Sequence, residues 1–87
     1  MDMLYCSVEV RLAKTFLSLA EEFGAVQPDG LLINLKMTHN DLANLIASTR
    51  ETVSSVLKEF RNKKLIECRD HFFILLSKDR LARLANG

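Results

Sequence analysis

The chain has 87 residues, of which 48% are hydrophobic and 26% charged, and a formal net charge of +1. A chain of this length supports one folded domain, which we expect to span residues 1–87. It contains no apolar run approaching the roughly 18 residues of a membrane helix, and it starts without the basic segment and apolar core of a signal peptide. We therefore expect a cytoplasmic protein with no membrane partner.

The reactive side chains do not form a catalytic or metal-binding pattern. Cys6 and Cys68 make no CxxC motif and have no histidine nearby at the spacing of metal ligands. We expect both cysteines to act as small apolar residues. The histidines, cysteines and carboxylates show no spacing typical of a nucleophile with its base. The sequence thus predicts a protein that is not an enzyme, with no metal and no cofactor in this domain.

The first third of the chain predicts a helix, a turn and a strand. Apolar residues recur at helical spacing over residues 7–23, and Gly24 is suited to cap the end of that helix. Residues 25–30 are expected to be a loop, since Pro28-Asp29-Gly30 is a typical turn sequence. The short apolar run at 31–36 predicts a strand.

Two closely spaced helices are predicted in residues 38–62. Thr38 is the expected N-cap of the first, with Asp41 as its capping-box partner. The second is expected to begin at Ser48 or Thr49 and to end near Asn62, and Ser48-x-x-Glu51 fits a capping box. The apolar positions are Leu42, Ala43, Leu45 and Ile46 in the first helix, and Val53, Val56, Leu57 and Phe60 in the second. Helices joined so tightly indicate a helix-turn-helix, whose second helix (about 49–62) would enter the DNA major groove.

The last third predicts a β-hairpin and a short helix. The apolar runs 65–69 and 72–76 are separated only by Asp70-His71, which favours a hairpin. A final helix is expected to start at Ser77 or Asp79. The expected fold class is α+β and mostly α: a winged helix-turn-helix with a three-helix core, a small antiparallel β-hairpin wing and a short C-terminal helix.

Polar residues occupy the face of the second helix opposite its apolar stripe. Arginine can contact guanine O6 and N7, and glutamate can accept a hydrogen bond from cytosine N4, so Arg50 and Glu51 are suited to contact bases. Each residue also has a simpler interpretation, because Arg50 could be a solvated surface charge and Glu51 the capping partner of Ser48. The polar residues of this face are Arg50, Glu51, Ser54, Ser55 and Lys58.

Residues 37–67 resemble the DNA-binding module of the Crp/Fnr superfamily of bacterial transcription regulators. The motif is T-x-x-[DE]-[IL]-[AG], followed by [ST]-R-E-T-V and an apolar-basic helix end. The matching positions are Thr38, Asp41, Leu42, Ala43, Thr49, Arg50, Glu51, Thr52 and Val53. With this resemblance, the candidate base contacts are Arg50, Glu51 and Ser54. The candidate phosphate contacts are Thr38, His39, Thr49, Thr52, Ser55 and Lys58.

The resemblance implies a TGTGA-like half-site, with three departures from the family pattern. Ser55 stands where many members have a second base-contacting arginine, so the outer position of the half-site is expected to be relaxed or altered. The wing turn lacks the glycine common in relatives, which predicts a short loop. The family's sensor domain and dimerisation helix are not among these residues, so we expect one module of a longer regulator whose effector is unknown.

The expected partners follow from the resemblance. They are double-stranded promoter DNA, a second copy of the full-length protein in a homodimer, and RNA polymerase as a further candidate. The low net charge keeps an alternative open, in which the winged helix is a protein-interaction module without specific DNA binding.

Overall fold

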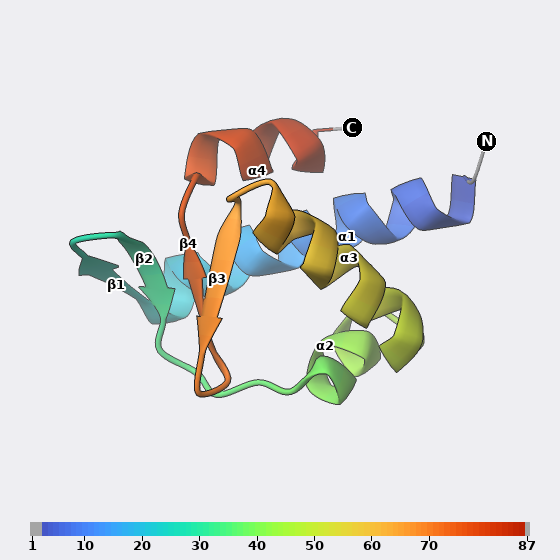
Figure 1. Ribbon diagram of the computed structural model, residues 1–87, viewed down its shortest axis with the longest axis horizontal. Helices are drawn as coiled ribbons and strands as arrows, with labels where there is room; N and C mark the ends of the chain where they lie inside the picture. Colours follow the sequence, from blue (N-terminus) through green and yellow to red (C-terminus); the bar gives the residue numbers. More distant parts are fainter. Residues whose placement is uncertain (1–2, 87) are drawn as a thin grey trace.

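The computed structural model describes residues 3–86, and their side chains from residue 7 onwards. Figure 1 shows a small twisted sheet on the left, with the helices behind it, above it and to its right. The elements in chain order are α1 (Met3–Phe23), β1 (Gly24–Gln27), β2 (Gly30–Ile33), α2 (His39–Leu45), α3 (Arg50–Asn62), β3 (Ile66–Arg69), β4 (Phe72–Leu75) and α4 (Lys78–Ala85). The predicted winged helix-turn-helix is confirmed.

The wing is the hairpin of β3 and β4, and its turn has two residues. Asp70 and His71 both have positive φ, 51° and 67°, and the strands pair up to Arg69 and Phe72 on either side of them. Two central residues with positive φ define the type I′ turn, whose twist suits a tight hairpin. The short wing loop expected from the sequence is therefore present, made without glycine.

The sheet has a second hairpin that the sequence did not predict. Its strands follow the order β1-β2-β4-β3, and each neighbouring pair is antiparallel. Residues 25–30 were expected to be a loop, but Gly24–Gln27 forms β1 and only the turn before Gly30 is irregular. Val26 is 89% exposed, so pairing with β2 rather than burial of an apolar pattern makes this strand. The hairpin projects from the body on the left of Figure 1.

The predicted strand over residues 31–36 is shorter in the structure. Strand β2 ends at Ile33, because the amide of Leu35 donates to the carbonyl of Ile33 and turns the chain toward α2. Gly24 does not cap α1 before a loop but leads directly into β1. A Cβ atom there would lie 2.2 Å from the carbonyl oxygen of Ala20, so the change from helix to strand requires glycine.

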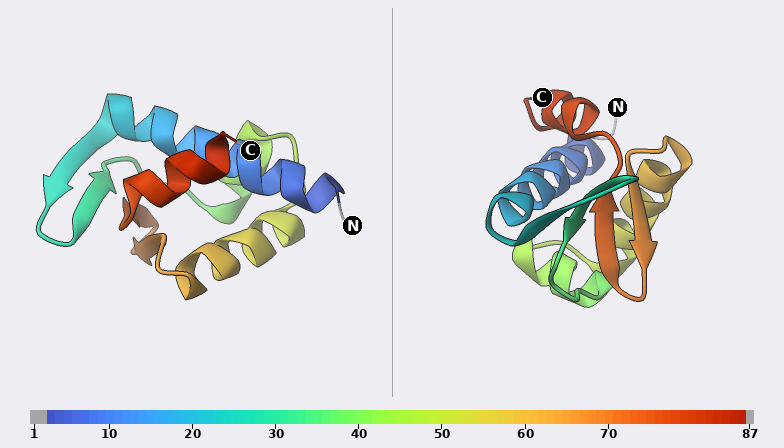
Figure 2. Two further views of the ribbon diagram at one scale, coloured as in Figure 1. Left: turned by 90° about the horizontal axis from the view of Figure 1, so that it is seen from above. Right: turned by 90° about the vertical axis from the view of Figure 1, so that its left-hand side faces the viewer.

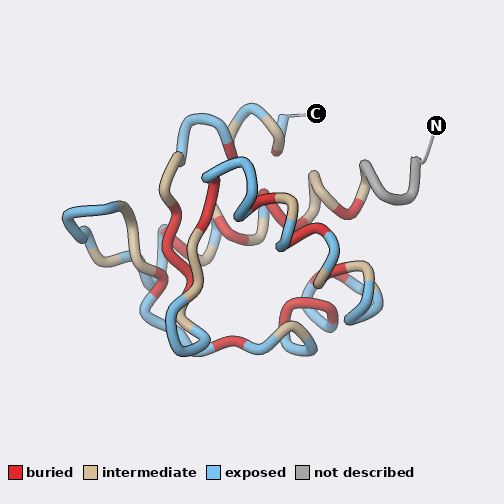
Figure 3. Tube along the Cα trace, in the orientation of Figure 1, coloured by how far each residue is buried: buried red, intermediate tan, exposed pale blue. Residues whose placement is uncertain are grey.

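The core lies between α1, the sheet and α3. Helix α1 runs behind the sheet and packs along α4, as both views of Figure 2 show. The rings of Phe16 in α1 and Phe73 in β4 meet with centroids 5.2 Å apart. Figure 3 shows the buried positions concentrated along the wing strands and the inner faces of α2 and α3. Cys68 is half-buried and packs against this core, as expected, whereas the side chain of Cys6 lies outside the described residues.

None of the helices in the described residues 3–86 is both long enough and apolar enough to span a bilayer.

Candidate nucleic-acid interface

Helix α2 begins with the capping box that the sequence predicted. The Thr38 hydroxyl oxygen accepts from the Asp41 amide at 3.1 Å, and the Asp41 carboxylate accepts from the Thr38 amide at 2.8 Å. The hydroxyl hydrogen of Thr38 remains available to donate outward. Leu42 and Ala43 are buried as expected, but Leu45 is 59% exposed and does not belong to the core.

The connection between the two helices shows why Ser48 is not the N-cap of α3. Ala47 has φ +55°, and the Ser48 amide donates to the carbonyl of Ala43 at 2.9 Å. This is the Schellman arrangement that closes a helix, with Ala47 in the left-handed position usually taken by glycine. Ser48 therefore belongs to the end of α2, and Thr49 is the N-cap of α3, accepting from the Thr52 amide at 3.2 Å.

The position of this cap leaves Glu51 at the second residue of α3. A capping-box partner must stand three residues after the cap, so the predicted pairing with Ser48 is wrong. Arg50 and Glu51 are both exposed, and their side chains make no hydrogen bond or ion pair with any other described residue. Neither side chain is used to hold the fold together.

The two faces of α3 are as different as the sequence predicted. Val53, Val56, Leu57 and Phe60 are at most 1% exposed. The opposite side carries exposed Arg50, Glu51, Ser55 and Lys58, with Thr52 and Ser54 at its margins. A helix anchored by one face presents the other at a fixed angle, which a duplex-contacting helix requires.

The threonines at the start of α3 differ in what they can donate. The Thr49 hydroxyl donates to the Thr52 hydroxyl oxygen at 2.9 Å. Thr49 has therefore used its only side-chain hydrogen, whereas Thr52 retains one. Of these two predicted phosphate contacts, Thr52 is the better placed to donate in the free protein.

His39 and Ser54, predicted separately, are hydrogen-bonded to each other across the two helices. His39 Nδ1 lies 2.7 Å from Ser54 Oγ. Burial lowers the pKa of His39 below its usual value, and the positive charges of Arg61, Arg50 and His71 lower it further. The sequence did not indicate this contact, since the residues are 15 positions apart and meet only because the helices cross.

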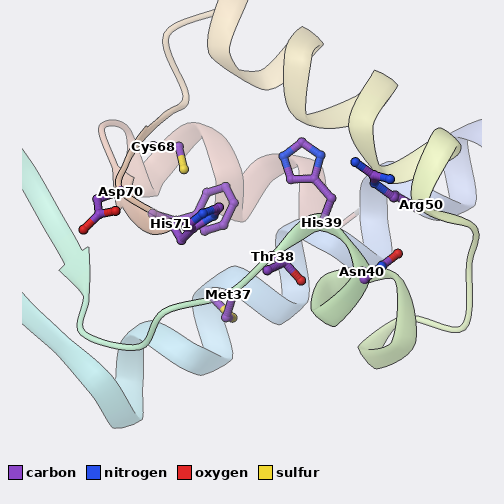
Figure 4. A pocket seen from close by; sticks show the side chains of 9 residues that line it. Met37, Thr38, His39, Asn40, Arg50, Cys68, Asp70 and His71 are labelled. Atoms are coloured by element: carbon purple, nitrogen blue, oxygen red, sulfur yellow. The ribbon is translucent and has the colours of Figure 1, made fainter.

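His39 stands in a groove of about 650 Å³ between the helix-turn-helix and the wing. Figure 4 shows its ring between Arg50 on one side and Cys68 and His71 on the other. The lining residues are Met37, Thr38, His39, Asn40, Arg50, Cys68, Asp70, His71 and Phe73. The groove thus brings together Thr38, His39 and Arg50, while Ser55 and Lys58 lie outside its lining. Asn40 was not singled out in the sequence, although its place directly after the capped start of α2 could have indicated it.

The wing tip is fixed against the segment that leads into α2. The Met37 amide donates to the carbonyl of His71 at 2.9 Å, and Lys36 forms an ion pair with Asp70 at 3.6 Å. His71, which the sequence indicated only as a turn residue, thereby joins the wing to the helix-turn-helix. The width of the groove between them is set by these contacts.

Basic side chains continue past the groove at the C-terminal end of α3. Arg61, Lys63 and Lys64 are exposed, and Lys63 pairs with Glu59 at 3.5 Å. Lys64 has φ +62° and closes α3 in a second Schellman arrangement, in which the Leu65 amide donates to Phe60. The cations are therefore displayed at a rigid helix end.

Comparison with known proteins agrees with this geometry. The model of the Crp-like helix-turn-helix domain matches residues 10–84. The CRP-like cAMP-activated global transcriptional regulator of Mycobacterium tuberculosis is 31% identical over 84 residues, covering 97% of this chain and 38% of that protein. The global nitrogen regulator of Synechococcus elongatus is 45% identical over 56 residues, covering 64% of this chain and 25% of that protein.

A solved structure shows the same fold at comparable identity. It is a CRP-family transcriptional regulator from Thermus thermophilus, with a TM-score of 0.82 and 31% identity, covering 92% of this chain and 40% of that one. This chain therefore spans between 25% and 40% of the length of these relatives. Since the family model covers most of its residues, the chain belongs to the Crp-like helix-turn-helix family of the Crp/Fnr transcription regulators.

Proposed function

We propose that this chain binds double-stranded promoter DNA in a sequence-specific manner, with α3 in the major groove. The observation that supports the proposal is that the side chains of Arg50 and Glu51 are exposed and, among the described residues, unpaired. Both are exposed on a helix whose opposite face is buried, and neither side chain makes a hydrogen bond or ion pair with another described residue. Because Thr49 caps α3, Glu51 is available to accept from a cytosine N4 while Arg50 contacts guanine O6 and N7.

The remaining candidate residues surround this pair. Ser54 is the third base contact we propose, and the half-site we expect is TGTGA-like, with a relaxed outer position because Ser55 is too short to replace an arginine there. The proposed phosphate contacts are Thr38, His39, Thr49, Thr52, Ser55 and Lys58. Phosphate contacts give affinity and orientation but no sequence preference.

The full-length regulator would bind as a homodimer. Two α3 helices can enter successive major grooves only if their half-sites lie about 34–36 Å apart along the duplex. One copy of this chain covers one half-site, so we expect it to bind weakly and with a steep dependence on salt. RNA polymerase remains a further candidate partner, for which promoter binding would be the first requirement.

The proposal is tested by fluorescence anisotropy with a labelled TGTGA-containing duplex at fixed salt. Arg50→Ala should weaken binding about 5- to 150-fold, which corresponds to the 1–3 kcal/mol of a bidentate arginine–guanine contact. Arg83→Ala is the matched control, since Arg83 is exposed on α4 and its removal changes the net charge equally. A duplex in which both guanines of the TGTGA half-site are replaced should abolish the difference between the two variants.

Two outcomes would contradict the proposal. Equal affinities for Arg50→Ala and Arg83→Ala would remove Arg50 from base contact and leave only non-specific attraction. No binding to any duplex at low salt would favour the alternative, a protein-interaction module, for which the exposed Leu45 on α2 offers an apolar contact.

A further inference from the structure

The hydrogen bond between His39 and Ser54 joins a proposed phosphate contact to a proposed base contact. His39 comes from the first turn of α2 and Ser54 from the margin of α3, and Nδ1 lies 2.7 Å from Oγ. Both side chains are half-buried, so the contact is not a chance meeting of two mobile surface groups. What one residue can offer to DNA therefore depends on the other.

The chemistry of imidazole limits which hydrogen bonds His39 and Ser54 can offer to DNA at the same time. Neutral histidine has one nitrogen that donates and one that accepts. If Nε2 carries the hydrogen and donates outward to a phosphate, Nδ1 must accept from Ser54, and the serine hydroxyl has no hydrogen left for a base. If Nδ1 carries the hydrogen, it donates to Ser54 and leaves the serine hydroxyl hydrogen available, but Nε2 can no longer donate. Only the charged imidazolium donates from Nε2 and frees the Ser54 hydroxyl at the same time.

The surroundings of His39 disfavour that charge in the free protein. Burial lowers the pKa of His39, and the positive charges of Arg61 and Arg50 of α3 and of His71 of the wing lower it further. The nearby carboxylates are already paired, since Asp41 accepts from the Thr38 amide and Asp70 pairs with Lys36. Cys68 completes this side of the groove lining. Among the described residues, the groove lining therefore offers His39 no unpaired carboxylate, and a DNA phosphate would supply the anion.

We propose that His39 is a positioning residue that couples binding of duplex DNA to the uptake of one proton. In neutral His39, the Ser54 hydroxyl donates to the imidazole. Once His39 is protonated, the imidazolium donates to Ser54 instead, and the hydroxyl can donate to a DNA base. This inference rests on the proposed DNA binding, and it assigns to His39 a role beyond simple phosphate contact. DNA affinity should then rise as the pH falls through the range in which histidine titrates.

The first test measures anisotropy of the TGTGA duplex from pH 8 to pH 5.5 at constant ionic strength. The 87-residue chain should bind up to about tenfold more tightly at the lower pH, which corresponds to a rise of one unit in one pKa. His39→Asn should remove this dependence, because asparagine can bond to Ser54 but does not titrate. His71→Gln is the matched control and should retain it.

A second variant tests the positioning role itself. Ser54→Ala should cost little affinity at pH 8, where its hydroxyl is held by His39. The cost should grow toward about tenfold at pH 5.5, where the hydroxyl is free to bond to a base. A purely structural role for the pair would give the same cost at both pH values, and that result would overturn the inference.

Proton NMR of the His39 ring separates failure of this inference from failure of DNA binding. The pKa of His39 should be higher in the complex than in the free chain. Binding without any change in that pKa, or a pH dependence that persists in His39→Asn, would overturn the coupling while leaving DNA binding intact. Absence of binding by the folded chain at every pH would overturn both.

Discussion

Ala47→Gly should stabilise the protein, because Ala47 occupies a backbone conformation that suits glycine. Its φ is +55° in the turn between α2 and α3. A left-handed conformation costs an L-residue about 1–2 kcal/mol. Glycine removes that cost but gives the unfolded chain more freedom, which costs about 0.5–1 kcal/mol. The net gain in the free energy of unfolding is therefore about 0.5–1 kcal/mol.

Ala47→Gly removes no buried contact and no hydrogen bond, so the change in the free energy of unfolding can be assigned to the backbone conformation. The Ala47 side chain is exposed, and the hydrogen bond that closes α2 runs from the Ser48 amide to Ala43 through the backbone. For a domain of this size the gain corresponds to a rise of about 2–8 °C in the melting temperature. Thermal unfolding followed by circular dichroism measures it.

The matched control is Ala82→Gly, which makes the same chemical change inside α4. There glycine adds freedom to the unfolded chain and removes a half-buried methyl group without relieving any strain, so the melting temperature should fall. Equal losses for Ala47→Gly and Ala82→Gly would refute the argument, since they would mean that Ala47 carries no strain.

Three further substitutions test other contacts. Thr49→Ala should cost about 1 kcal/mol in the free energy of unfolding while Ser48→Ala costs almost nothing; chemical denaturation measures both, and the reverse order would restore Ser48 as the N-cap. Glu9→Gln should stabilise the fold by roughly a few tenths of a kcal/mol at pH 7, because burial and the charge of Glu59 raise the pKa of Glu9. Because the pKa of Glu9 is raised in the folded protein, its charged form destabilises the fold at pH values above that pKa. The stabilisation by Glu9→Gln should therefore vanish in thermal melts near pH 4, and equal stabilisation at pH 7 and pH 4 would contradict this cause.

Local patterns predicted the parts of this fold whose causes are local. The capping box of Thr38 and Asp41 depends on four consecutive residues, and the buried face of α3 on helical spacing alone. The two-residue wing turn follows from the apolar runs on either side of Asp70 and His71. In each case the residues that determine the structure are neighbours in the chain.

The elements that the sequence predicted incorrectly depend on backbone hydrogen bonds, which cannot be inferred from the side chains. Strand β1 is a strand because β2 lies beside it, although its own residues are mostly exposed. Ser48 has the side chain of an N-cap, but its amide is committed to Ala43 in the preceding helix. The crossing of α2 and α3 similarly brings His39 to Ser54. A sequence pattern assigns each residue to one element, whereas these residues are shared between two.

The net charge of +1 is a poor guide to DNA binding because the charges are segregated. Residues 50–64 carry five lysines and arginines against two glutamates, and one of those, Glu59, pairs with Lys63. Much of the negative charge that balances them lies elsewhere in the chain, as with Asp29 in the turn between β1 and β2, which pairs with Arg69 of the wing strand β3. Attraction between exposed charges is largely screened beyond about 8–10 Å at physiological salt. A duplex lying along α3 would therefore respond to the charge of that helix rather than to the net charge of the chain.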